Sequence, residues 1–130
     1  MRFATPEQAL MTNKAATGIG SEMLVESFQH VILTIAGGNT SVLTVKIKAS
    51  MSDAKPDFSA AQSETNRWDY VQLKDLQDNS TINGDSGVAL AANDVRQFEV
   101  NTNGIRFICP DVSAYTSGRV SVYGKGFENE

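Results

Sequence analysis

Short segments in which apolar and polar residues alternate follow one another from Phe28 to Tyr123. Each segment ends at Gly, Asn, Asp or Pro, the residues that favour turns. A period of two places the apolar side chains on one face of a β-strand, whereas a helix needs a period near 3.6. The pattern predicts an all-β domain, an antiparallel β-sandwich or jelly roll of about seven or eight strands.

The strongest alternation lies in residues 42–49. We expect one row to face the core and the other, Val42, Thr44, Lys46 and Lys48, to face water. Residues 28–36 are apolar on both faces, which predicts a central strand covered on two sides. Glycine-rich turns at residues 37–39 and at Asn103-Gly104 predict two hairpins. The residues that we expect to be largely buried are Leu43, Val45, Ile47, Phe98, Val100, Phe107, Val120 and Val122.

Residues 1–22 differ from the rest of the chain because their apolar residues are thinly spread. Residues 6–11 are compatible with one helical turn capped by Thr5. We interpret 1–22 as an extended N-terminal arm and 23–130 as the sandwich domain; the alternative is a frayed terminus. The arm would order on a neighbouring subunit, and removal of residues 1–20 would leave the sandwich folded. Its expected anchors are Phe3, Leu10, Met11 and Ile19.

A long irregular connection, residues 51–66, interrupts the strand pattern. A loop of this length inside a compact domain usually has a function or packs as a small unit of its own. We expect Phe58 to hold it against the body and propose Pro56 and Phe58 as further partner-binding residues.

Composition excludes several classes of function. The formal net charge is −4 and the basic residues are scattered, which argues against a nucleic-acid partner. No apolar run is long enough to span a membrane. The N-terminus lacks the basic-then-apolar order of a signal peptide, so export by the usual route is not expected. The chain's one cysteine, Cys109, lies in an apolar run and is expected to be a buried, inert thiol.

Reactive groups are few, and each has a structural explanation. His30 lies within a strand, and no spacing implies a catalytic partner for it. A cluster of Asp and Asn residues around residues 75–85 favours turns rather than a calcium loop. We therefore predict no catalytic residue, no metal and no cofactor. Trp68 and Tyr70 share one strand face, where core packing is favoured over a stacking platform for a sugar or a base.

The order of segments resembles small virion structural proteins of tailed bacteriophages. The resemblance runs from residue 28 to residue 127 and leaves the N-terminal region outside. It rests on a Lys-rich strand ending in Ala-Ser, then SDAKPDFSAAQS, N-x-W-D-Y-V, D-x-R-x-F-E-V-N and a closing G-R-V-S-V strand. Among such proteins it best suits a capsid decoration, or cement, protein.

That resemblance implies a small β-sandwich, made in the cytoplasm of the bacterial host and bound outside the assembled head. Its implied partners are the major capsid protein and copies of itself in a homotrimer. It carries no catalytic residues. Two alternatives remain open: a phage tail or head-fibre adaptor or receptor-binding module, and a carbohydrate-binding module with Trp68 and Tyr70 exposed.

Overall fold

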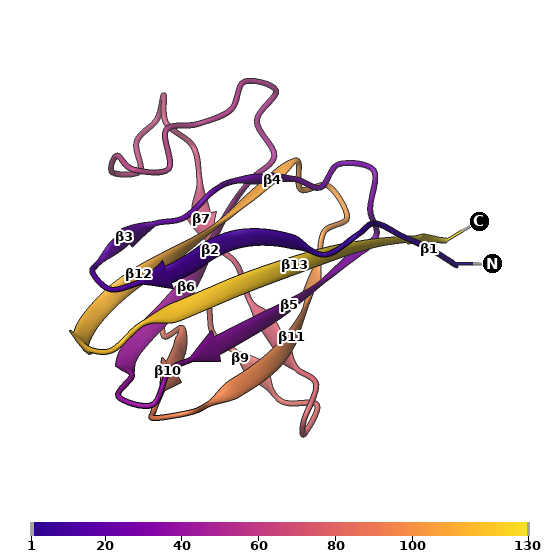
Figure 1. Ribbon diagram of the computed structural model, residues 1–130. Helices are drawn as coiled ribbons and strands as arrows, with labels where there is room; N and C mark the ends of the chain where they lie inside the picture. Colours follow the sequence, from indigo (N-terminus) through magenta and orange to yellow (C-terminus); the bar gives the residue numbers. More distant parts are fainter. Residues whose placement is uncertain (1, 130) are drawn as a thin grey trace.

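The computed structural model describes residues 2–129, which form thirteen β-strands and no helix (Figure 1). In chain order the strands are β1 (Arg2–Ala4), β2 (Gln8–Lys14), β3 (Gly18–Ile19), β4 (Met23–Leu24), β5 (His30–Gly37), β6 (Val42–Ser50), β7 (Asp69–Tyr70), β8 (Leu73–Asp75), β9 (Thr81–Ile82), β10 (Val88–Leu90), β11 (Val95–Asn101), β12 (Phe107–Ser117) and β13 (Val120–Asn129). The all-β prediction is confirmed.

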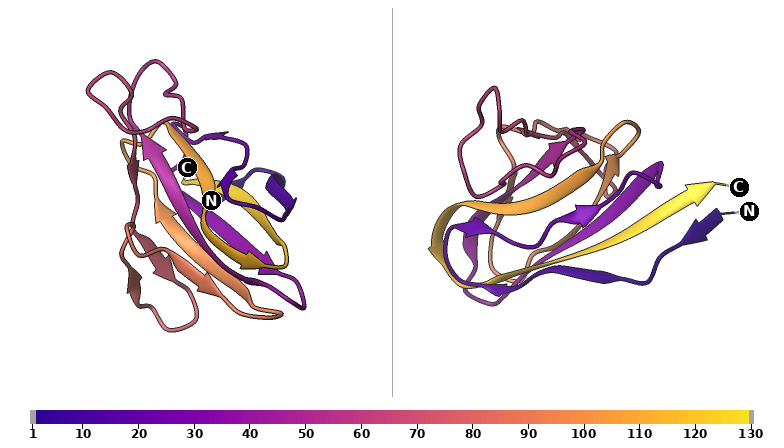
Figure 2. Two further views of the ribbon diagram at one scale, coloured as in Figure 1. Left: turned by 90° about the vertical axis from the view of Figure 1, so that its left-hand side faces the viewer. Right: turned by 90° about the horizontal axis from the view of Figure 1, so that it is seen from above.

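Two antiparallel sheets face each other as a sandwich (Figure 2). Sheet A has the order β1-β13-β5-β11-β8-β9, and β2 pairs with β13 beside β1. Sheet B has the order β10-β6-β12-β3, with β4 also on β12 and β7 also on β6. The paired strands β1 and β13 extend beyond the body, so the two ends of the chain lie side by side (Figure 1).

The inner faces of both sheets supply one continuous core. Seven of the eight residues expected there are at most 4% exposed, namely Leu43, Val45, Ile47, Phe98, Val100, Val120 and Val122. Phe107 is the exception, since it is half-buried on the outer face of sheet B. Its neighbour Ile108 points inward instead, and a shift of one residue along a strand reverses the face.

Both expected hairpins are wrong, because each turn carries the chain from one sheet to the other. β5 belongs to sheet A and β6 to sheet B, and the same holds for β11 and β12. The fully buried Ser41 fixes the first crossing: its Oγ accepts from the Gly38 N–H at 2.7 Å and donates to the Arg119 carbonyl at 2.5 Å. Gly118 has φ +82°, and a Cβ there would lie 2.5 Å from Ser41 Cα. The turn between β5 and β6 is therefore in close contact with the turn between β12 and β13.

The N-terminal region also differs from its prediction. Residues 6–11 form no helical turn; β2 pairs with β13, and Leu10 and Met11 lie in the core at 1% and 4% exposed. Register shifts along this pairing mark bulges, which turn these two consecutive residues inward together. Residues 8–14 are therefore part of the sandwich rather than a separate arm.

The outer faces of the two sheets are covered differently. β5 is central, as predicted, between β13 and β11. Its outward row, including Ile32 and Thr34, is only half-buried, and no described segment lies over this face in Figures 1 and 2. The expectation of cover on both sides is wrong for a single chain. Sheet B, by contrast, is covered by the 51–66 loop.

Candidate functional site

The 51–66 loop is anchored on the outer face of sheet B by a second, smaller apolar cluster. Phe58, at 3% exposed, packs with Trp68 and Cys109. Ile19, Tyr70 and Phe107 close its margin, and Pro56 is also buried. The predicted anchoring role of Phe58 is confirmed. Because Pro56 and Phe58 are both buried, they can position the loop but offer little surface to a partner.

A buried lysine fastens the same loop. Lys48 Nζ donates to the Phe58 carbonyl at 2.7 Å and lies 4.1 Å from the centre of the Trp68 ring. Asp111 Oδ2 is 3.9 Å away and balances the charge. Lys48 is only 7% exposed, so the expectation that its row faces water is wrong at this position. The 51–66 loop covers Lys48, and this loop lies outside the alternating segment from which the row was predicted.

Hydrogen bonds within the loop fix its path. The side chain of Asn66 donates to the carbonyls of Asp57 at 2.8 Å and Ala61 at 3.0 Å, and its Oδ1 accepts from the Asp57 N–H at 2.8 Å. Trp68 Nε1 donates to the Ala60 carbonyl at 3.0 Å. Residues 59–65 are exposed on this framework. A surface held in one conformation loses less entropy on binding than a mobile loop does.

A hollow of about 510 Å³ lies where the loop begins and ends. It is lined by Met51, Ser52 and Asp53 at the start of the loop and by Arg67, which follows it. Met51 is 78% exposed, the most exposed of the large apolar side chains in the described chain. Arg106 donates to the carbonyl of Asp53, one of the lining residues. The loop lies at one end of the sandwich (Figure 1), and its exposed residues and the hollow form a surface of mixed polarity.

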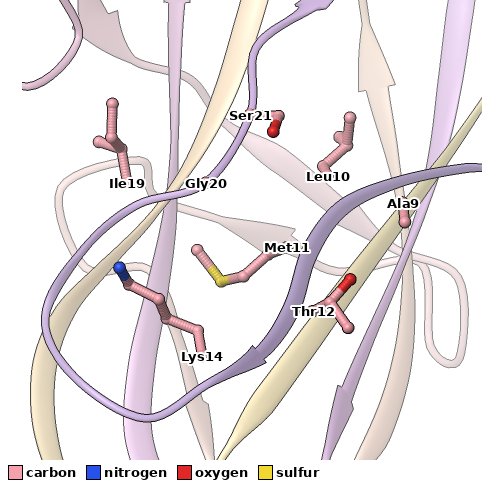
Figure 3. A pocket seen from close by; sticks show the side chains of 8 residues that line it. All are labelled: Ala9, Leu10, Met11, Thr12, Lys14, Ile19, Gly20 and Ser21. Atoms are coloured by element: carbon pink, nitrogen blue, oxygen red, sulfur yellow. The ribbon is translucent and has the colours of Figure 1, made fainter.

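A second hollow, of about 440 Å³, lies between the edge of sheet A and the edge of sheet B (Figure 3). β2 supplies Met11 and Lys14, and β3 supplies Ile19 on the opposite wall. The two edges are joined where the Ser21 N–H donates to the Leu10 carbonyl at 2.7 Å. The structure thus brings Leu10, Met11 and Ile19 together around one hollow, but as parts of the sandwich and not of a separate arm.

Phe3, the other predicted anchor, lies on β1, where its backbone pairs with that of Glu128. Its side chain lies outside the described part of the structure. The partner-binding role stays a prediction for all six residues proposed from the sequence: Phe3, Leu10, Met11, Ile19, Pro56 and Phe58. Sequence reasoning missed Lys48, Asp111 and Arg67. A lysine within a strand that precedes a long loop was the available signal for the first of them.

The reactive groups are engaged in structural interactions. Burial raises the pKa of the Cys109 thiol to about 12, so it is protonated at neutral pH. His30 Nδ1 lies 3.7 Å from Glu99 Oε1 on the neighbouring strand. Three side-chain oxygens of the acidic cluster accept backbone N–H groups two residues on: Asp75 from Gln77, Asp78 from Ser80 and Asn83 from Asp85. These bonds show that the clustered Asp and Asn residues stabilise turns.

Trp68 and Tyr70 meet edge to face, with ring centres 5.3 Å apart and planes at 74°. Trp68 is 9% exposed and Lys48 covers one of its faces. Tyr70 is half-buried, and burial together with the nearby Asp111 raises its pKa. The pair therefore belongs to the cluster that holds the loop and does not form an open stacking platform.

The described residues lack two further features, a group that could hold a metal ion and a helix that could span a membrane. They contain no group of three or more His, Cys, Asp or Glu side chains placed to hold a metal ion. Nor does any helix within them have the length and apolarity needed to cross a membrane.

Comparisons with known proteins found a structural match. No protein family model matches the chain, and no curated protein matches it. Among solved structures it is similar to the crystal structure of the SPBc2 prophage-derived protein YomS, with a TM-score of 0.73 and 16% identity. The similarity covers 98% of this chain and 96% of that one. The two proteins therefore share their fold over nearly their whole lengths.

Proposed function

We propose that this chain is a virion structural protein of a tailed bacteriophage that binds the outside of the assembled head as a decoration protein. The observation that carries the proposal is the whole-length similarity in fold to a prophage-derived protein. The strand and turn segments between residues 28 and 127, which resemble phage virion proteins, support it independently. The proposed partners are the major capsid protein and further copies of this chain, three in the oligomer that the resemblance implies.

The geometry is suited to binding rather than to catalysis. The proposed contact with the capsid is the exposed part of the 51–66 loop, because Lys48, Phe58 and Trp68 hold that loop in one conformation. A decoration protein occupies many equivalent positions on one shell. Contacts that are weak singly are then reinforced by neighbouring copies.

The buried position of Trp68 disfavours the carbohydrate-binding alternative. Sugar recognition by stacking needs an accessible ring face, and Lys48 and Phe58 pack against this indole. The tail or fibre alternative uses the same fold and differs only in where the protein lies on the particle.

The test adds purified protein to heads that lack it and measures how much sediments with them. We expect the wild type to bind the heads and to protect them from heat. An Ala61→Arg variant, altered at the exposed loop, should bind at least about tenfold more weakly, since interfacial charge without a partner is costly. Ala92→Arg, exposed in the turn between β10 and β11, is the matched control and should bind normally. Wild-type protein that binds tails but not heads would overturn the proposal.

A further inference from the structure

The outer face of sheet A carries several apolar side chains that the described chain leaves partly or largely exposed. Ile32 and Ala36 lie on β5, and Val95 on β11 is 60% exposed. At the end of β8, Leu76 is 44% exposed. Antiparallel sheets with one wet face normally carry polar residues on it. The two-sided apolar pattern of β5, which the single chain does not satisfy, indicates that another molecule covers this face.

Charged residues of opposite sign flank β5 on this face. Register places Lys125 of β13 on one side of Ile32, and Glu99 of β11 on the other. One strand further out, Lys74 of β8 lies beside Glu99. Across these four strands the row therefore reads basic, apolar, acidic, basic, from Lys125 through Ile32 and Glu99 to Lys74.

Rotating a second copy by half a turn about an axis along β5 reverses the order of this row. Ile32 then meets Ile32 of the other copy, and each Lys125 meets a Glu99. An adjacent row, which runs from Ala9 through Tyr123, Thr34 and Gln97 to Leu76, also matches, because Ala9 would meet Leu76.

We propose that this face binds a second copy of the chain, sheet A against sheet A, about a two-fold axis along β5. Such an interface is self-complementary, as a two-fold dimer requires. The half-buried apolar residues along β5 supply its centre, and the charged rows fix the register and exclude other alignments. Face-to-face packing with nearly aligned strands is a common arrangement of β-sheets. The proposal is independent of where the protein lies on a phage particle.

Sedimentation equilibrium on the full chain tests this interface. We expect an even number of copies: two, or six if a ring of three also forms. Ile32→Lys should raise the dissociation constant at least about tenfold, while Val42→Lys, exposed on sheet B, should leave it unchanged. Lys125→Glu should weaken association, and adding Glu99→Lys should restore it. Circular dichroism checks that each variant is folded.

Cross-linking gives a second readout that does not depend on destabilising the interface. A cysteine at position 32 should be joined to its copy by a short bismaleimide, whereas one at position 42 should not. Cys109 is buried and should not react in either variant. A wild-type chain that is monomeric, that forms only odd oligomers, or that associates equally well with Ile32→Lys would overturn the proposal. Loss of head binding by Ile32→Lys without a change in self-association would instead assign this face to the capsid.

Discussion

Some residues in this protein have structural roles that the surrounding sequence pattern does not predict. Lys48 belongs by pattern to a row facing water, yet it is buried because a loop ten residues away folds over it. Ser41 joins the turn between β5 and β6 to the turn between β12 and β13, because its Oγ accepts a hydrogen bond from Gly38 and donates one to Arg119. Alternation predicted seven of eight core positions, because it reports which face a side chain occupies. It cannot report what lies over the opposite face, since that depends on contacts between distant segments.

Cys109 provides a test at the residue scale. Burial raises its pKa to about 12, above the value near 8.5 of a free thiol. The folded protein should therefore not react with a thiol reagent at pH 8, and unfolding in guanidinium should release the reaction. Because the unfolded thiol ionises first, this group should lower stability as pH rises from about 9 towards 12. Labelling of native protein as fast as that of unfolded protein would contradict the assignment.

At the scale of elements, the N-terminal region shows where local pattern fails. Bulges in the pairing of β2 with β13 turn Leu10 and Met11 inward together, which removes the alternation that would have identified a strand. The sequence instead offers a proline and a capping signal that favour a helical turn. Pairing with β13 and burial in the core override that local preference. The crossings between sheets were missed for a similar reason, since a turn sequence does not specify which sheet the next strand joins.

The position of β2 contradicts the expectation that residues 1–20 can be removed with little change in stability. Leu10→Ala should lower the free energy of unfolding by about 2–5 kcal/mol, as for other buried leucines. Thr12→Ala, exposed on the same strand, should change it little. Deleting residues 1–14 should unfold the chain or lower its melting temperature markedly. Equal stability of both point variants in urea would restore the view of a loose arm.

The loop is a separate element with its own small core, and a change in that core should loosen it selectively. Phe58→Ala removes the ring that packs on Trp68, the chain's one tryptophan, so indole fluorescence should shift to longer wavelength. Backbone amides of residues 57–66 should exchange faster, while those of β5 and β13 stay protected. Glu64→Ala, at the exposed tip, is the control and should change neither signal. Global loss of protection in Phe58→Ala would show that the loop is part of the main core.

For the whole molecule, the fold class could be predicted from sequence, whereas the two proposed interaction surfaces could not. A period-two pattern indicates a sandwich whatever binds to it. The loop surface and the charge row on sheet A exist only after strands from distant parts of the chain have paired, such as β13, β5 and β11. The whole-length similarity to a prophage-derived protein shows that the two share this fold. Fold alone does not distinguish the head from the tail.

The most direct measurement is the number of copies of this chain per purified phage particle, obtained by quantitative mass spectrometry with heads and tails analysed separately. The decoration function predicts that the chain is found on heads, in numbers comparable to the major capsid protein. Heads stripped of it should regain the same number when the purified chain is added back. A chain present in only a few copies and recovered with tails would contradict the account.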